Sequence, residues 1–294
     1  MKTGIVFEGG ALRTIYSCGV MDSFLEAGFP LPDYTVGASA GAAYGVSYLS
    51  KQIGRNLEIL TKYAGDKRYM GVGQLLDRKN RSYFGIQFTY DEIPNRLVPF
   101  DYDAFAAYEG VMEAVMTDLS TGMPYYAAVP RRDSEFLMLQ ATCAMPLLFP
   151  VYHIDGVPCL DGGVADGIPY QRAFDQGCDR VIVVLTRERS YVRGAESMLP
   201  LIRRVYRKYP EFVKLAERRH VAYNRDRARL FELERKGEVM VFYPQSTEGY
   251  SRTERDVVKI KGLYNNGLAD GRSRIQDVRE FWNVSFITRE IPAF

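Results

Sequence analysis

A short glycine and serine motif, Gly37-Ala38-Ser39-Ala40-Gly41, lies between a strand pattern and a helix pattern. The strand pattern covers residues 34 to 36, and the helix pattern, which is rich in small residues, runs on to Leu49. A serine on so sharp a turn needs small neighbours, because larger side chains keep the backbone from closing. The motif therefore predicts a nucleophile elbow with Ser39 as the nucleophile, and the alternative is a tight turn with a structural role only.

A second glycine turn, Glu8-Gly9-Gly10-Ala11-Leu12-Arg13, also joins a strand pattern to a helix pattern. The strand covers residues 4 to 7 and the helix residues 15 to 27. Glycines in such a turn free backbone N–H groups to face a negative oxygen, as in an oxyanion hole or a phosphate cradle. The letters match neither the dinucleotide fingerprint nor the P-loop, so a nucleotide-binding protein is a minor alternative.

These two strand and helix pairs favour an α/β fold with a parallel sheet covered by helices. Two later runs belong to the same architecture: residues 180 to 185 (RVIVVL) and residues 239 to 243 (VMVFY). Both are continuous apolar runs of the kind found in strands that are buried on both faces. We therefore expect a mostly parallel central sheet.

The scarcity of histidine limits which group can activate the serine. The only histidines are His153, which precedes several candidate acids, and His220, which lies in a basic helical run. Neither occupies the late position expected in the α/β-hydrolase order. A carboxylate or a lysine is therefore the expected base. The strand pattern of residues 157 to 160 leads into Asp161-Gly162-Gly163, which presents a candidate acid on a tight turn, although an aspartate often begins an ordinary turn.

The cysteines Cys18, Cys143, Cys159 and Cys178 are far apart and form no CxxC pair. Zinc and redox chemistry lack support, and we expect no cofactor and no metal. The first residues lack the apolar stretch of a secretory signal, and no apolar run reaches the length of a membrane span. These patterns predict a cytoplasmic protein.

The net charge of +2 conceals a basic segment. Residues 1 to 200 sum to −5, whereas residues 201 to 236 hold 12 basic and 5 acidic side chains and sum to +7. The near-zero total argues against nucleic-acid binding. The basic segment is typical of one or two amphipathic helices. Its charge fits either a solvated outer face or a peripheral contact with anionic membranes.

Two other segments have distinct patterns. Residues 70 to 130 are rich in aromatic side chains, which are typical of a satellite core or of an apolar substrate groove. Residues 251 to 282 are more polar and predict a helix, a turn at Asn265-Asn266-Gly267 and a second helix.

Four motifs in the same order resemble the patatin-like phospholipases: FEGGALR, GASAG, ATCAMPLLFPV at 141 to 151 and LDGGVADGIP at 160 to 169. The resemblance covers roughly residues 3 to 190. It implies a three-layer α/β/α sandwich, a Ser39–Asp161 dyad with elbow glycines Gly37 and Gly41, and an oxyanion hole from Gly9, Gly10, Ala11 and Arg13. The expected domains are a catalytic domain of residues 1 to 190, with core strands continuing to about 245, and a small helical C-terminal extension of residues 191 to 294.

The loop departs from the family pattern GGGxRG, because Ala11 replaces the third glycine and Thr14 the last. Alanine keeps its N–H but restricts positive φ, so the hole is either distorted or adopts a permitted conformation. The resemblance implies a serine acyl hydrolase of lipid esters, phospholipase A-like or lysophospholipase-like, which forms a covalent acyl-enzyme. The alternative is a non-catalytic protein of the same fold that binds lipids or a partner. The oligomeric state stays open.

Overall fold

The computed structural model describes residues 1–77 and 80–283 and is built around one eight-stranded sheet. The strand order is β5-β6-β3-β2-β1-β7-β8, and β4 also pairs with β3. The strands are β1 (Thr3–Phe7), β2 (Tyr34–Ala38), β3 (Val111–Asp118), β4 (Pro124–Ala128), β5 (Tyr152–Ile154), β6 (Val157–Asp161), β7 (Arg180–Val184) and β8 (Val239–Phe242). The pairs among β3, β2, β1, β7 and β8 are parallel, and those of β4, β5 and β6 are antiparallel.

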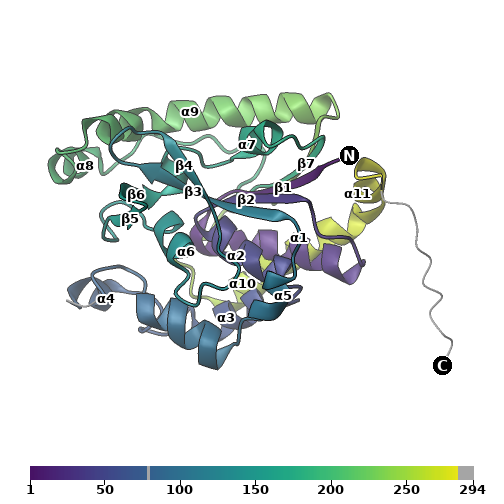
Figure 1. Ribbon diagram of the computed structural model, residues 1–294, viewed down its shortest axis with the longest axis horizontal. Helices are drawn as coiled ribbons and strands as arrows, with labels where there is room; N and C mark the ends of the chain where they lie inside the picture. Colours follow the sequence, from purple (N-terminus) through teal and green to yellow (C-terminus); the bar gives the residue numbers. More distant parts are fainter. Residues whose placement is uncertain (78–79, 284–294) are drawn as a thin grey trace.

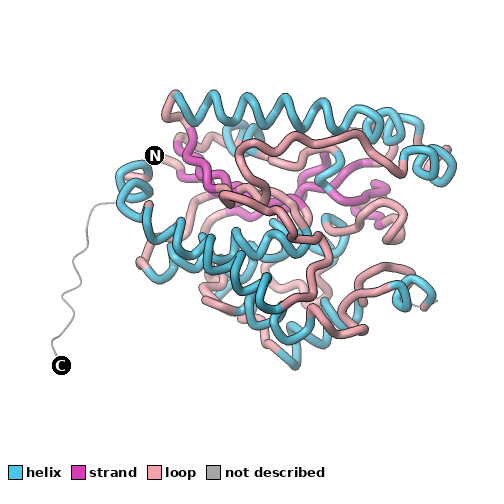
Figure 2. The backbone as a smooth tube through the Cα atoms, turned by 180° about the vertical axis from the view of Figure 1, so that it is seen from behind, coloured by secondary structure: helices cyan, strands magenta, loops and turns pink. Residues whose placement is uncertain are grey.

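Helices cover both faces of this sheet (Figures 1 and 2). One layer contains α7 (Tyr170–Asp175), α8 (Leu199–Val205) and α9 (Pro210–Arg235). The other contains α1 (Ile15–Glu26), α2 (Ala40–Leu49), α3 (Arg55–Tyr63), α4 (Val72–Leu76), α5 (Tyr102–Ala106), α6 (Leu137–Thr142), α10 (Val257–Ser273) and α11 (Ile275–Phe281), with further helical segments at Ala11–Thr14 and Phe88–Leu97. The short helical turn at Gly162–Val164 lies on the side of α8 and α9, because Val164 packs with Ile202 and Phe212. The expected α/β fold with a mostly parallel sheet and a C-terminal helical region is confirmed.

Alternate residues of the central strands supply the two apolar layers of the core. Ile5 and Phe7 of β1 pack with α1 and α2, while Val6 packs with α7 and α9 on the opposite face. Side chains alternate between the two faces of a strand, so a buried strand needs apolar residues at every position. This explains why the continuous apolar runs of the sequence form the inner strands.

The Asn and Gly turn predicted at residues 265 to 267 is wrong. Helix α10 continues through these residues and ends only at Ser273. A Cβ on Gly267 would lie 2.0 Å from the carbonyl oxygen of Tyr16, and one on Gly19 would lie 2.1 Å from the carbonyl oxygen of Tyr264. The glycines therefore allow the backbones of α1 and α10 to pack closely, and their role is a helix contact instead of a turn.

The segment expected to form the C-terminal extension also contributes to the sheet, because β8 pairs in parallel with β7. The boundary at residue 190 stays a prediction. Within residues 1–77 and 80–283, no helix is both long and apolar enough to cross a membrane.

Candidate active site

Ser39 lies on a strained turn between β2 and α2. Its φ of 54° and ψ of −130° are unfavourable for a residue with a side chain. A Cβ on Gly37 would lie 2.5 Å from the amide nitrogen of Ala42, and one on Gly41 would lie 2.5 Å from the carbonyl oxygen of Phe7. Both positions therefore require glycine. The elbow geometry expected from the sequence is present in the structure.

Ser39 and Asp161 are in direct contact, although 121 residues separate them in the chain. The Ser39 hydroxyl donates a hydrogen bond of 2.7 Å to Oδ2 of Asp161. The other carboxylate oxygen, Oδ1, accepts the amide hydrogen of Gly163 at 2.8 Å. The turn after Asp161 needs Gly162, because a Cβ there would lie 1.9 Å from the carbonyl oxygen of Val115. Both carboxylate oxygens are thus held in place.

Burial controls the acidity of Asp161. Its exposed fraction is 6%, and the resulting desolvation raises the pKa of the carboxyl group above its ordinary value. The hydrogen bond from Ser39, the charge of Arg219 and the amide of Gly163 act in the opposite direction. A raised pKa makes this carboxylate a stronger proton acceptor than an exposed aspartate.

Two residues that hold Ser39 and Asp161 in place were not identified from the sequence. Thr142 accepts the amide hydrogen of Ser39 at 2.9 Å through its hydroxyl group, which in turn donates to the carbonyl oxygen of Val115. Arg219 donates from Nε to the carbonyl oxygen of Gly163 at 2.8 Å. Thr142 lies within the third motif quoted above, but Arg219 lies in the basic segment, where nothing in the sequence distinguishes it from its neighbours.

The glycine loop packs directly on the serine elbow. A Cβ on Gly9 would lie 2.8 Å from the carbonyl oxygen of Ala38, and one on Gly10 would lie 2.6 Å from Oγ1 of Thr186. Ala11 has a φ of 49° and so adopts a left-handed conformation, which glycine adopts more readily than alanine. Among the described residues, no hydrogen-bond acceptor is found for the Ala11 amide. The loop thus keeps a backbone donor available beside Ser39, whereas Arg13 contributes a buried guanidinium.

Buried hydrogen bonds hold this loop against the neighbouring strand. The Glu8 carboxylate accepts the amide hydrogen of Thr186 at 2.6 Å and its hydroxyl hydrogen at 3.0 Å. The phenol of Tyr223 on α9 donates to the same carboxylate. Because β1 and β7 are adjacent parallel strands, these bonds connect the loops that follow their carboxyl ends.

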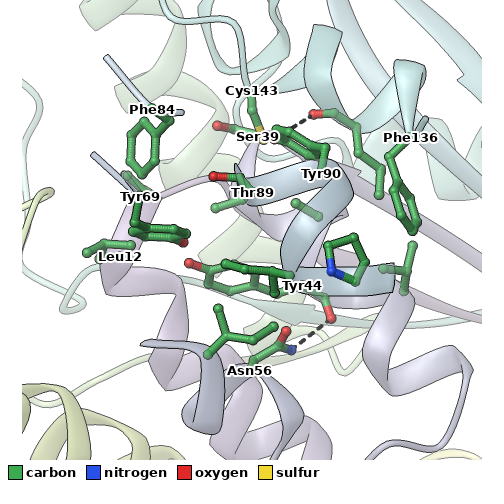
Figure 3. Close-up of a pocket in the computed structure, with 18 of the residues that line it drawn as sticks. Leu12, Ser39, Tyr44, Asn56, Tyr69, Phe84, Thr89, Tyr90, Phe136 and Cys143 are labelled. Atoms are coloured by element: carbon green, nitrogen blue, oxygen red, sulfur yellow. Dashed lines mark hydrogen bonds between the residues drawn. The ribbon is translucent and has the colours of Figure 1, made fainter. Parts of the chain in front are cut away.

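An apolar cavity of about 110 Å³ opens on one side of Ser39. Figure 3 shows aromatic side chains from several segments around it, and its lining includes Leu12, Tyr44, Tyr69, Phe84, Tyr90, Phe100, Phe136 and Cys143. Phe105 and Tyr108 of the same aromatic segment are instead buried in the main core. The segment of residues 70 to 130 therefore serves both as core and as cavity wall.

A larger cavity of about 540 Å³ opens on the other side of Ser39. It contains Asp161 and the loop of residues 8 to 13, and its lining includes Arg13, Arg187, Arg193, Arg219 and Arg252. Ser39, Ala11 and Met145 border both cavities. Neither His153 nor His220 lines either of them, so the group beside the serine is a carboxylate.

Comparisons with known proteins identify the family. The family described as patatin-like phospholipase matches residues 5–174, and a domain of unknown function, DUF6363, matches residues 209–283. The uncharacterized protein YjjU of Escherichia coli K12 is 24% identical over 204 residues, which cover 63% of this chain and 52% of that protein. The chain therefore spans about half the length of the curated relative that it matches. VipD from Legionella pneumophila aligns structurally with a TM-score of 0.40 and 12% identity, over 92% of this chain and 67% of that one. By the family match over more than half of its length, the chain belongs to the patatin-like phospholipases, a family of acyl hydrolases.

Proposed function

We propose that the protein is a serine acyl hydrolase that cleaves lipid acyl esters through Ser39 and Asp161. The observation that carries the proposal is the 2.7 Å hydrogen bond from the hydroxyl of Ser39 to the buried carboxylate of Asp161. The strained elbow places this serine between an apolar cavity and a larger cavity whose lining contains several arginines. The acyl chain of an ester would fit the apolar cavity, and its polar alcohol part would fit the larger cavity.

The reaction proceeds by acyl transfer. Asp161 accepts the proton of Ser39 as Oγ attacks the ester carbonyl, and the amide of Ala11 with its neighbours in the loop stabilises the oxyanion. The alcohol leaves with the proton and the acyl group stays on Ser39. Water then attacks the acyl-enzyme, Asp161 accepts its proton, and the fatty acid leaves as the proton returns to Ser39.

We assign the apolar cavity to the acyl chain of the substrate, and a larger side chain in the cavity wall tests this assignment. Ala43 on α2 lines this cavity, and a phenylalanine there would fill part of it. We expect Ala43→Phe to lower kcat/KM for an octanoate ester about tenfold or more, while the acetate ester with the same leaving group changes by less than about threefold. Hydrolysis of esters of increasing chain length measures this. The matched variant Ala107→Phe, at an exposed position, should leave the profile unchanged. A uniform loss across all chain lengths would contradict the assignment.

We also propose that the basic segment of residues 201 to 236 contacts anionic membranes. Leu201 and Val205 on α8 are 41% and 53% exposed, and they flank the basic residues Arg203 and Arg204. Leu201 also lines the larger cavity, so this surface adjoins the candidate active site. Exposed apolar side chains beside basic ones are typical of a surface that binds an anionic lipid interface.

The membrane proposal predicts that the double variant Leu201→Ser/Val205→Ser loses most of its binding to phosphatidylglycerol vesicles. Cosedimentation at low and high salt measures this, and salt should weaken the binding of the unaltered protein. The control variant Ile53→Ser/Val111→Ser removes side chains of comparable exposure, 51% and 44%, and should bind normally. Equal binding to phosphatidylcholine vesicles at any salt would refute an electrostatic contact.

A further inference from the structure

The larger cavity carries more positive charge than the reaction at Ser39 requires. Its lining contains five arginines and three carboxylates. Two of the carboxylates are engaged elsewhere, because Glu8 accepts hydrogen bonds from Thr186 and Tyr223, and Asp161 accepts them from Ser39 and Gly163. The third, Glu196, lies 3.9 Å from Arg219. Three carboxylates do not balance five arginines, so the lining of the cavity keeps an excess of positive charge.

The side chain of Arg13 shows this excess of positive charge most clearly. Its side chain is 8% exposed and lines the cavity, and its Nε is buried without a hydrogen-bond partner. Within residues 1–77 and 80–283, no ion pair is found for its guanidinium. The nearby charge of Glu8 offsets the cost of burying this guanidinium only in part, so an anionic ligand would complete the site.

Three further arginines reach the same cavity from two loops, and the loop between β7 and α8 supplies both Arg187 and Arg193. Arg187 follows β7, lies 4.1 Å from the ring centre of Tyr191, and also has a buried Nε without a partner. Arg193 lies 4.8 Å from the ring centre of Tyr223. Arg252 comes from the loop before α10. An aromatic ring lies against the guanidinium groups of Arg187 and Arg193. Arg187 also donates from Nη1 to Oγ1 of Thr247, and its unpartnered Nε keeps a donor for an anion.

The arginines are close enough to repel one another. Burial, together with the positive charges of Arg187 and Arg252, lowers the pKa of Arg13 to about 10, while the charge of Glu8 acts in the opposite direction. Burial, together with the charge of Arg193, lowers the pKa of Arg219 to about 9, while the charge of Asp161 acts in the opposite direction. At neutral pH these groups remain charged, so an anion between them would relieve both their desolvation and their mutual repulsion.

We propose that Arg13, Arg187, Arg193 and Arg252 form a subsite for the phosphate of an anionic acyl ester, with the ester carbonyl at Ser39. This inference rests on the proposed function and specifies its substrate class. The same positive charges would repel the quaternary amine of a zwitterionic headgroup. The substrate class is therefore a phosphate ester with net negative charge, such as a lysophospholipid with a terminal phosphate.

The test compares substrates that share one acyl chain. The unaltered protein should hydrolyse lysophosphatidic acid with a kcat/KM at least about tenfold higher than that for lysophosphatidylcholine. Arg252→Gln should reduce this ratio about tenfold, and Arg193→Gln should act in the same direction. The control Arg96→Gln, an exposed arginine that lines neither cavity, should preserve the ratio. Equal kcat/KM for the two lipids would overturn the subsite and leave the hydrolase assignment intact.

A binding measurement separates the subsite from the chemistry. Glycerol 3-phosphate should raise the thermal midpoint of Ser39→Ala more than inorganic phosphate does, while glycerol and choline have no effect. Arg252→Gln in the same background should abolish this shift. Binding without hydrolysis of any ester would refute the proposed function but support the subsite. Equal shifts with inorganic phosphate and glycerol 3-phosphate, together with no preference between the lipids, would overturn the headgroup assignment.

Discussion

Replacing Ser39 with alanine should lower ester hydrolysis by about 10³-fold or more, because the substitution removes the atom that forms the acyl-enzyme. Release of p-nitrophenol from a butyrate ester measures this. A fluorophosphonate probe should label the unaltered protein at Ser39 and leave Ser39→Ala unlabelled. The matched variant Ser120→Ala, at an exposed serine, should keep full activity and labelling.

A second substitution at the same position distinguishes lost chemistry from lost folding. Ser39 has a φ of 54°, a conformation that glycine adopts without strain. We expect Ser39→Gly to be as inactive as Ser39→Ala, but more stable than the alanine variant by roughly 1 kcal/mol or more in urea denaturation. An unlabelled, inactive protein with Ser39 intact would instead support the non-catalytic alternative.

Replacing Asp161 with asparagine should lower kcat by about 10² to 10⁴-fold, because the amide cannot accept the proton of Ser39. The unaltered protein should lose activity as the pH falls through the pKa of Asp161, since the protonated carboxyl group is not a base. Burial raises this pKa, so the acid limb of the profile should lie above the ordinary aspartate value of about 3.9. The residual activity of Asp161→Asn should lack this limb.

The same substitution should stabilise the protein at neutral pH. The pKa of Asp161 is raised in the folded state, so the folded protein binds the proton more tightly than the unfolded chain. Its ionisation therefore costs stability as the pH rises through the folded pKa. Asp161→Asn removes that cost, and its gain in thermal midpoint should be larger at pH 8 than at a pH below the ordinary aspartate pKa of about 3.9. The exposed control Asp175→Asn should show neither effect. A loss of stability at pH 8 would contradict the assigned burial of this charge.

The sequence predicted the elbow and the general fold because both depend on short segments. Steric conflict at Gly37 and Gly41 is local, and so is the need for apolar residues at every position of a strand that is buried on both faces. The backbone conformation of Ala11 did not follow from the sequence, because an alanine permits a distorted loop as well as the left-handed conformation that the structure contains. The turn predicted at residues 265 to 267 failed for a related reason. Glycine marks either a turn or a close helix contact, and only the position of α1 decides between them.

Contacts between segments that are far apart in the sequence determined how the residues of the site are arranged. The sequence by itself determined that a serine stands on a strained turn, that well-placed histidines are lacking, and that an aspartate follows a strand far along the chain. Only the tertiary structure brought Asp161 within 2.7 Å of Ser39 and buried it enough to raise its pKa. The tertiary structure also gathered arginines from separate loops and from α9 into one cavity. The net charge of the whole chain is only +2, whereas burial and proximity in the fold set the electrostatic potential that a substrate meets.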